Sequence, residues 1–143
     1  MAPASAFSPA LALDYVRELS TDVRAGIALD AAGERLAGPE TLAEAARELL
    51  AAAGVAAELE AATADGVVCA ARSERHALIV VCGPYALPAL VRRDLRTALG
   101  ALTGEGAGEP AGPAPPETGA SDDARLQRAA EALISAVQRG FPA

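Results

Sequence analysis

The chain has 143 residues, a length typical of one domain with an extra segment, and only 3% of them are aromatic. All 12 basic residues are arginine and no lysine occurs, a composition typical of a high-GC genome. The net charge of −7 argues against a general polyanion-binding surface, so nucleic acid is not an expected partner. No apolar stretch reaches the roughly 20 residues that span a bilayer, and the N-terminus lacks the features of a signal peptide. We therefore expect a cytoplasmic protein that does not enter the membrane.

One segment of unusual composition divides the chain. Residues 103–120 are rich in glycine, proline and glutamate and contain no leucine, isoleucine, valine or aromatic residue. Such a segment buries too little apolar surface to offset the entropy lost on ordering, so we predict a disordered linker. The linker separates a globular unit at 8–102 from a C-terminal helix at 121–139, and residues 1–7 are predicted to be a loose leader.

The globular unit begins with a helix and a hairpin. Ser8 followed by Pro9 is a helix start, and the i, i+4 spacing of Leu11, Tyr15 and Leu19 predicts the buried stripe of a helix that ends near Ser20. Residues 23–30 then alternate as a strand, with Val23, Ala25, Ile27 and Leu29 on one face. The turn from Asp30 to Gly33 and a short strand at 34–38 complete the hairpin.

A second helix and three strands follow. Pro39 and Gly54 mark the two ends of a helix, which has an apolar stripe and a separate row of glutamates at 40, 44 and 48. Residues 56–63 alternate like an edge strand with one wet face. The tight turn at 64–66 leads into strands at 67–72 and 77–82, of which the second is apolar on both faces and should be central.

The last helix of the unit is expected at 87–102. Its predicted seam is Leu87, Val91, Leu95, Ala98 and Leu102. The element order is therefore helix, two strands, helix, three strands, helix (αββαβββα). The economical packing of these elements is an α+β fold, a five-stranded antiparallel sheet with helices on both faces.

No constellation of residues in the chain points to catalysis. Nucleophile-elbow, phosphate-loop and zinc-protease motifs are missing, and the lack of lysine excludes Schiff-base chemistry, so we expect no enzyme. A single His76 and two cysteines cannot form a structural zinc cluster, and no cofactor is expected. His76 itself follows Glu74 and Arg75 in a predicted hairpin turn, where it is either a proton-sensitive contact or, as we favour, an ordinary exposed turn histidine. Cys69 and Cys82 lie in apolar runs and are interpreted as core residues rather than a redox pair.

Two charged groups remain open to interpretation. The one basic concentration of the chain consists of Arg72, Arg75, Arg92, Arg93 and Arg96. These arginines either hold a phosphate, or supply an arginine finger to the nucleotide site of another protein, or, as we favour, are solvated helix and turn residues. The glutamates Glu40, Glu44 and Glu48 form either a solvated face or a contact for a partner.

The C-terminal helix is amphipathic and needs a docking site. Its apolar stripe consists of Leu126, Ala130, Leu133, Ile134 and Val137. A lone helix of this length is marginal in water, so it must dock on its own domain, on a second copy or on a partner.

The order and pattern of elements resemble the roadblock/dynein light-chain family. The resemblance rests on LDYVRELSTDVRAGIALDAAGERLAG, on the helix TLAEAARELLAAAG, and on the pair ALIVVC and LVRRDLRTAL, over about 95 residues. It implies a profilin-like sheet and a homodimer formed through the third strand and the middle helix. The implied dimer contacts are Leu42, Ala45, Ala46, Leu49, Leu50, Leu59 and Ala61.

The same resemblance implies a function. Bacterial members often act as scaffolds or regulators beside small Ras-like GTPases, so we expect a non-enzymatic homodimer that binds a small GTPase or a related signalling protein, with the row Glu40, Glu44 and Glu48 as contact. The alternative is a ligand-sensing module, in which small strand residues (Ala25, Gly26, Ala28, Ala70 and Ala71) leave an internal cavity.

Overall fold

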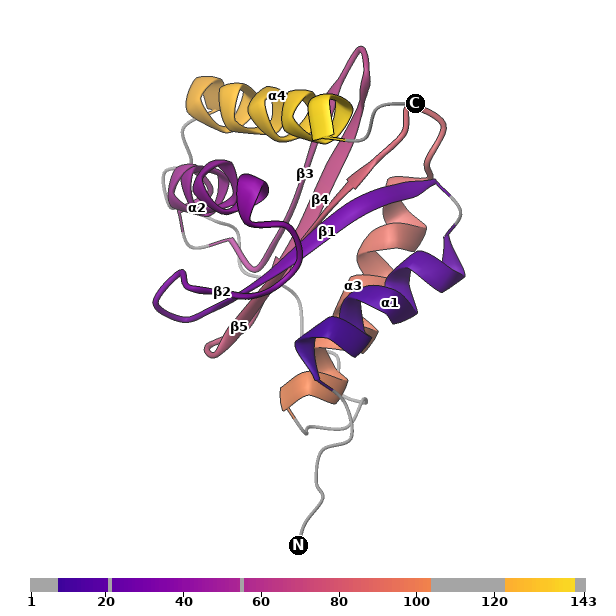
Figure 1. The fold of residues 1–143 in the computed structure, drawn as a ribbon, viewed down its shortest axis with the longest axis vertical. Coiled ribbons are helices and arrows are strands. Elements are labelled where there is room, and N and C mark those ends of the chain that lie inside the picture. Colours follow the sequence, from indigo (N-terminus) through magenta and orange to yellow (C-terminus); the bar gives the residue numbers. More distant parts are fainter. Residues whose placement is uncertain (1–7, 21, 55, 104–122, 141–143) are drawn as a thin grey trace, which may run out of the picture.

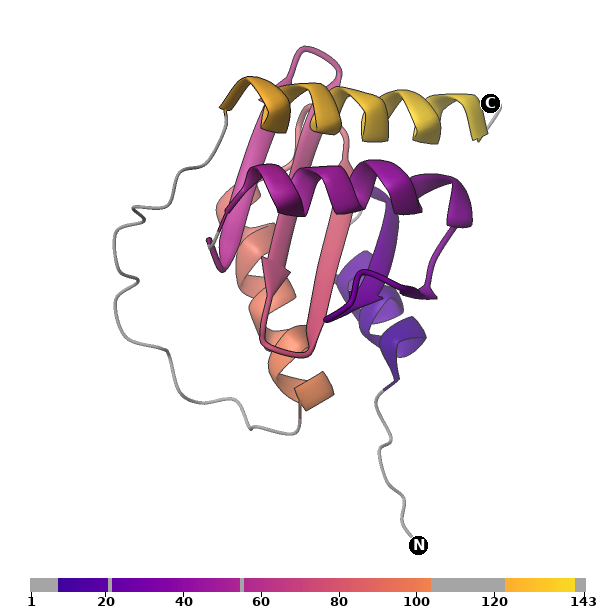
Figure 2. The ribbon, with the colours of Figure 1, turned by 90° about the vertical axis from the view of Figure 1, so that its left-hand side faces the viewer.

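The computed structural model describes residues 8–20, 22–54, 56–103 and 123–140. A single sheet lies between two pairs of helices, with α2 and α4 on one face and α1 and α3 on the other (Figure 1, Figure 2). The elements in chain order are α1 (Pro9–Leu19), β1 (Val23–Asp30), β2 (Arg35–Ala37), the 3₁₀ turn η1 (Glu40–Leu42), α2 (Ala43–Ala52), β3 (Glu58–Thr63), β4 (Gly66–Arg72), β5 (His76–Cys82), α3 (Pro88–Thr103) and α4 (Asp123–Gly140). The α+β fold and the element order match the expectation. The predicted leader and nearly all of the predicted linker lie outside the described residues, although Thr103 belongs to α3.

The five strands form one antiparallel sheet in the order β2-β1-β5-β4-β3. The apolar strand β5 is central, as its two-sided hydrophobic pattern predicts, and it is buried along nearly its whole length. The strand β3 lies at the edge of the sheet. Its register with β4 is fixed by the two-residue turn between Thr63 and Gly66.

Side-chain chemistry at the turns explains where the strands end. The Asp30 carboxylate accepts hydrogen bonds from the backbone amides of Ala32 and Glu34, both at 2.9 Å. Gly33 follows with a φ of +88°, a conformation that residues with a Cβ rarely adopt. The predicted turn between β1 and β2 is therefore confirmed.

The sheet separates two hydrophobic clusters. One lies beneath α2 and α4 and contains Ile27, Leu49 and Ile79, and the other lies beneath α1 and α3 and contains Val16, Val80 and Leu95. Because strand side chains alternate between faces, neighbouring residues of β4 and β5 supply both clusters. The packing on one face of the sheet therefore involves different side chains from the packing on the other face.

Three details of the predicted helix and strand faces are wrong. On α1 the buried residues are Ala12, Leu13 and Val16, whereas Leu11 and Leu19 are about half exposed. The smaller Ala12 brings the helix closer to the sheet, where a Cβ on Gly26 would approach Leu13 Cδ2 to 3.0 Å.

The other two differences concern Val23 and Leu87. A register shift between Val23 and Ala25 moves Val23 to the α1/α3 face, whereas Ala25, Ile27 and Leu29 face the α2/α4 side. Leu87, which we assigned to the buried seam of the last helix, precedes α3 and is 63% exposed. Leu99, which we did not assign to that seam, is buried in the same cluster as Val91, Leu95 and Ala98.

The start of the middle helix also differs from the prediction. Pro39 precedes the short 3₁₀ turn η1, and the α-helical geometry of α2 begins only at Ala43. Its end agrees with the prediction, because Gly54 has a φ of +67°, which is typical of the residue just past a helix. Glu40 is therefore not on the same α-helical face as Glu44 and Glu48.

Candidate interaction surfaces

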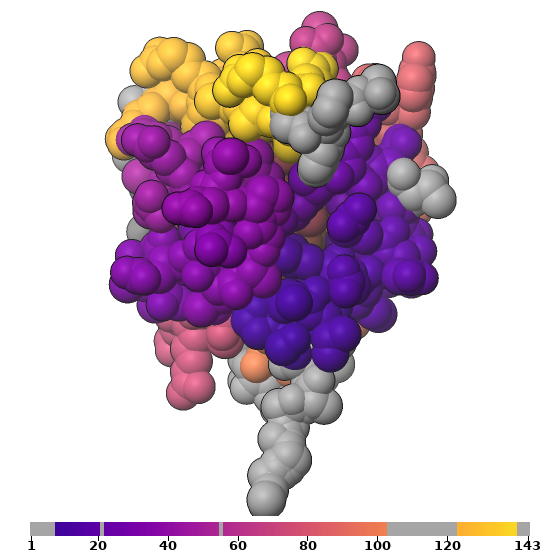
Figure 3. All heavy atoms as spheres, viewed as in Figure 1, coloured from indigo at the N-terminus to yellow at the C-terminus, as the bar shows by residue number. Residues whose placement is uncertain are grey.

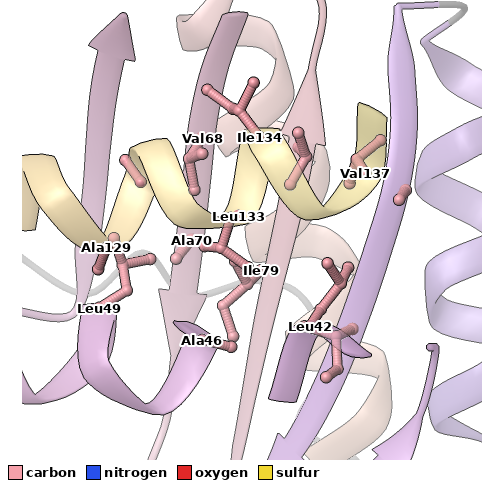
Figure 4. Close-up of a cluster of buried hydrophobic side chains, with 14 of the residues drawn as sticks. Leu42, Ala46, Leu49, Val68, Ala70, Ile79, Ala129, Leu133, Ile134 and Val137 are labelled. Atoms are coloured by element: carbon pink, nitrogen blue, oxygen red, sulfur yellow. The ribbon is translucent and has the colours of Figure 1, made fainter. Parts of the chain in front are cut away.

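Helix α4 docks on its own chain, beside α2 and across the sheet. Figure 4 shows Leu133 of α4 lying among Ala70 and Ile79 of the sheet, with Ala46 and Leu49 of α2 beside it. The α4 residues Ala129, Ala130, Leu133, Ile134 and Val137 are all buried, and Leu126 is partly buried against the same cluster. The predicted apolar stripe is therefore the docking face, and α4 and α2 form one continuous surface (Figure 3).

Two polar contacts accompany this packing near the start of α4. The Arg125 guanidinium pairs with the Glu48 carboxylate of α2 at 3.0 Å. The Gln127 side-chain amide donates a hydrogen bond to the Ala62 carbonyl of β3 at 2.9 Å. Both contacts are exposed to solvent, so they orient the helix more than they hold it.

The outer edge of β3 carries the backbone groups that α4 reaches. The amide of Arg72 donates to the carbonyl of Ala57 at 2.8 Å. The backbone groups of the odd-numbered residues in this segment therefore bond to β4, and the backbone N–H and C=O groups of the even-numbered residues point away from the sheet. Ala62 is one of the outward residues, and Gln127 binds its carbonyl. No described strand pairs with this edge of the sheet.

The residues proposed for a dimer contact fall into two groups. Leu42, Ala46, Leu49 and Ala61 are buried inside the chain, in the cluster that α4 covers. Ala45, Leu50 and Leu59 are partly buried and pack against the same cluster. The structure therefore brings all seven residues together on one face, and α4 covers that face. The dimer contact itself stays a prediction.

The glutamate row lies beside the same face. Glu40 on η1 and Glu44 and Glu48 on α2 are exposed. The carboxylate of Glu48 is paired with Arg125, whereas Glu40 and Glu44 form no ion pair with any described residue. Glu40 and Glu44 are therefore exposed to solvent, and Glu48 contacts α4.

The arginines of α3 pair with glutamates of β3. Arg96 Nη1 lies 3.1 Å from a Glu58 carboxylate oxygen, and Arg92 lies 3.6 Å from Glu58 and 3.4 Å from Glu60. The even-numbered side chains of β3 face α3, so this edge of the α1/α3 face is polar. Asp94, which pairs with Arg93 at 3.8 Å, is 8% exposed.

Arg72 of β4 serves a structural role. Its guanidinium donates to the carbonyls of Leu50, Gly54 and Ala56, which lie at and beyond the end of α2. The Leu50 carbonyl lies in the last turn of α2 and also accepts from the Ala53 amide at 3.2 Å. A cation at a helix C-terminus is favourable. Partial burial lowers the pKa of Arg72 from its usual value. This role was missed because it depends on how β4 passes α2.

His76 borders a hollow of about 500 Å³ at the ends of α2 and two hairpins. The hollow is also lined by Asp30, Arg47 and Glu74, and Arg47 donates to the Gly33 carbonyl at 3.0 Å. His76 is the first residue of β5 and is half buried, and its Nδ1 makes no hydrogen bond within the described residues. The expected exposed turn histidine is thus a partly covered strand residue.

A second hollow, of about 540 Å³, lies between α1 and α3. Its walls include Tyr85, which is 87% exposed, as well as Leu19, Leu87 and Leu90. Four of the large hydrophobic residues that remain exposed thus lie around one hollow. The feature of the sequence that could have indicated this hollow is the pair of large apolar residues in the loop at 85–87, Tyr85 and Leu87.

Cys69 and Cys82 are free and buried on the α1/α3 face. Cys69 of β4 faces Val80 of β5, two residues from Cys82, so the two thiols are diagonal neighbours on adjacent strands. The hydrogen bond to Cys69, together with burial, raises the pKa of the Cys82 thiol. Both cysteines pack as core residues, as the sequence suggested.

Within the described residues, the small strand residues are packed closely against their neighbours. Ala28, Ala70 and Ala71 are buried among other side chains, and the space at Gly26 is occupied by Leu13 and Val80. A hollow of about 170 Å³ beside Ala25 and Gly26 is bordered by α1 and the β2 end.

The described residues offer neither a metal cluster nor a membrane span. They contain no group of three or more histidine, cysteine, aspartate or glutamate residues able to hold a metal ion. Within the same ranges, no helix has the length and apolar character that crossing a bilayer requires.

Comparison with known proteins identifies the fold. No protein-family model matches the chain, and no curated protein matches it in sequence. The crystal structure of a Roadblock/LC7 domain from Streptomyces avermitilis is similar, with a TM-score of 0.55 and 9% identity. The similarity covers 65% of this chain and 92% of that domain, so about a third of the present chain has no counterpart there. The chain therefore has a roadblock-type fold.

Proposed function

We propose that the protein is a non-enzymatic scaffold or regulator that forms a homodimer and binds a small Ras-like GTPase or a related signalling protein. The observation that carries this proposal is the roadblock-type fold, in which β3 ends the sheet and no strand of the described residues pairs with its outer edge. Open edges of this kind favour pairing with another strand, and two identical edges can pair about a two-fold axis.

The partner surface in this proposal is the glutamate row beside α2. Glu40 and Glu44 are exposed and unpaired with any described residue, so they are free to meet arginine or lysine side chains of a partner. Charged residues at such a site affect the rate and specificity of association more than its final strength. A GTPase with a basic patch near its switch regions fits this chemistry.

Binding to purified small GTPases of the source genome, loaded with GDP or GTP, tests the proposal. Calorimetry should detect one of them. The variant Glu40→Arg/Glu44→Arg should weaken its binding about tenfold or more, because the reversal places like charges opposite each other in the complex. The matched control is Glu18→Arg, an exposed position on α1 at the opposite face of the sheet. Equal binding by both variants would place the contact elsewhere, and no binding to any GTPase would reject this partner class.

A further inference from the structure

We infer that α4 is a built-in competitor of the homodimer: docked α4 masks the α2/β3 surface, and a second copy binds there only after α4 leaves. This inference rests on the homodimer of the proposed function and adds its regulation. It requires that α4 and the second copy need the same surface and that α4 can leave without unfolding the domain.

The first requirement is met by the buried residues. Ala46 and Leu49 of α2 and Ala61 of β3 are no more than 5% exposed, and they share their cluster with Ala130 and Leu133 of α4. A partner helix cannot contact side chains that are already covered. Because closely packed interiors have no spare volume, the two occupants exclude each other.

The second copy and α4 also present similar surfaces. In a two-fold dimer both copies use the same patch, so a patch that contains α2 faces a second α2/β3 surface. The buried residues of α2 are Ala43, Ala46, Leu49 and Ala52, and those of α4 include Ala129, Ala130 and Leu133, so both helices combine small residues with leucine. Figure 2 shows α4 running antiparallel to α2 across the sheet. A two-fold axis perpendicular to the sheet would place a second α2 antiparallel as well.

The polar contacts of α4 involve the same surface. Gln127 binds the Ala62 carbonyl on the outer edge of β3, where a second strand would have to pair. Arg125 neutralises Glu48, the member of the glutamate row nearest to α4. Docked α4 therefore occupies a backbone acceptor of the edge and one carboxylate of the partner row.

The chain connection allows α4 to leave. Helix α3 ends at Thr103 and α4 begins at Asp123, on the opposite face of the sheet. A connection of this length reaches about 65 Å when extended, far more than the size of the domain. The cluster beneath α1 and α3 is separate from the cluster beneath α4. In the structural comparison, 65% of this chain matches 92% of the Streptomyces domain, so that domain has the same fold with about a third fewer residues than this chain. Release of α4 would thus leave most of the fold in place.

Variants of the full chain that loosen or fix α4 test the inference. Arg125→Glu/Gln127→Ala places two carboxylates together and removes the β3 contact, without touching the buried stripe. Glu48→Cys/Arg125→Cys allows a disulfide that holds α4 on α2 when oxidised and frees it when reduced. The matched control is Arg128→Glu, which has the same charge change at an exposed position of α4. Sedimentation over a range of concentrations gives the dimer dissociation constant for each protein, and non-reducing electrophoresis shows whether the disulfide is within one chain.

The inference predicts that the loosened variant dimerises about tenfold more tightly than the wild type and Arg128→Glu, and that oxidation of the cysteine variant weakens dimerisation by at least about tenfold. Equal dissociation constants for the loosened and fixed proteins would overturn the competition and leave the homodimer intact. A covalent dimer in the oxidised variant would show that α4 docks on the neighbouring copy, which also overturns it. Monomers in every variant at all concentrations would reject the homodimer itself.

Discussion

The two faces of the sheet are closed to different degrees. On the α2/α4 face, Leu42, Leu49 and Leu133 are all less than 2% exposed. On the α1/α3 face, Leu19 and Leu87 stay more than half exposed beside a hollow of about 540 Å³. The difference follows from α4, which adds a second apolar helix beside the short α2. Helix α4 therefore completes the cover on the α2 side of the sheet.

The largest contrast between the faces is expected from matched leucine truncations. Leu133→Ala removes a fully buried side chain from beneath α4 and should lower the free energy of unfolding by about 2–4 kcal/mol. Leu87→Ala removes a side chain that is 63% exposed and should change it by less than about 0.5 kcal/mol. Chemical denaturation followed by circular dichroism measures both. Similar losses would contradict the assignment of α4 to a packed face.

A smaller effect is expected from the cysteines of the α1/α3 face. The pKa of Cys82 is raised in the folded chain, so this thiol stays protonated there while the unfolded chain ionises near pH 8.5. Above about pH 8 the unfolded state therefore binds fewer protons than the folded state. The free energy of unfolding is unaffected below about pH 8 and falls above it, by up to about 1.4 kcal/mol per pH unit. Cys82→Ala should flatten this dependence in melts between pH 7 and 10. A wild-type profile that is already flat would contradict the protected thiol.

The smallest effect is expected from the ion pairs between α3 and β3. Arg96→Ala removes the contact with Glu58 and should cost about 0.5 kcal/mol at low salt, because both side chains are partly solvated. Arg93→Ala is the control, since its side chain is 65% exposed and only 3.8 Å from Asp94. Thermal melts at low and high salt separate the two variants, and the difference should shrink as salt screens the pair. A cost that does not depend on salt would indicate packing rather than charge.

Local features of the fold could be predicted from the sequence because they depend on neighbouring residues. The alternation in residues 56–63, the two-sided hydrophobicity of β5 and the turn chemistry of Asp30 and Gly33 all lead to the observed elements. The face of α1 could not be predicted, because Leu11 and Ala12 each start a plausible stripe. The close approach of α1 to Gly26, which selects Ala12 and Leu13, is a tertiary contact.

The interaction surfaces were only partly predictable for the same reason. An amphipathic stripe predicts that α4 docks, and its residues lie in the cluster beneath α2 and α4, but the stripe does not identify the surface on which the helix docks. Likewise, the arginines of α3 were expected in solvent and instead pair with Glu58 and Glu60, because α3 passes over the edge strand. Which surfaces meet is decided by the arrangement of the whole chain.

Hydrogen exchange measured by mass spectrometry at several protein concentrations tests the central claim most directly. At low concentration the amides of α4 should be protected and the outward amides of Glu58 and Glu60 should exchange freely. As dimers form, the account predicts that α4 loses protection while β3 gains it, because one occupant replaces the other. Protection of α4 that persists or increases while β3 becomes protected would contradict the account.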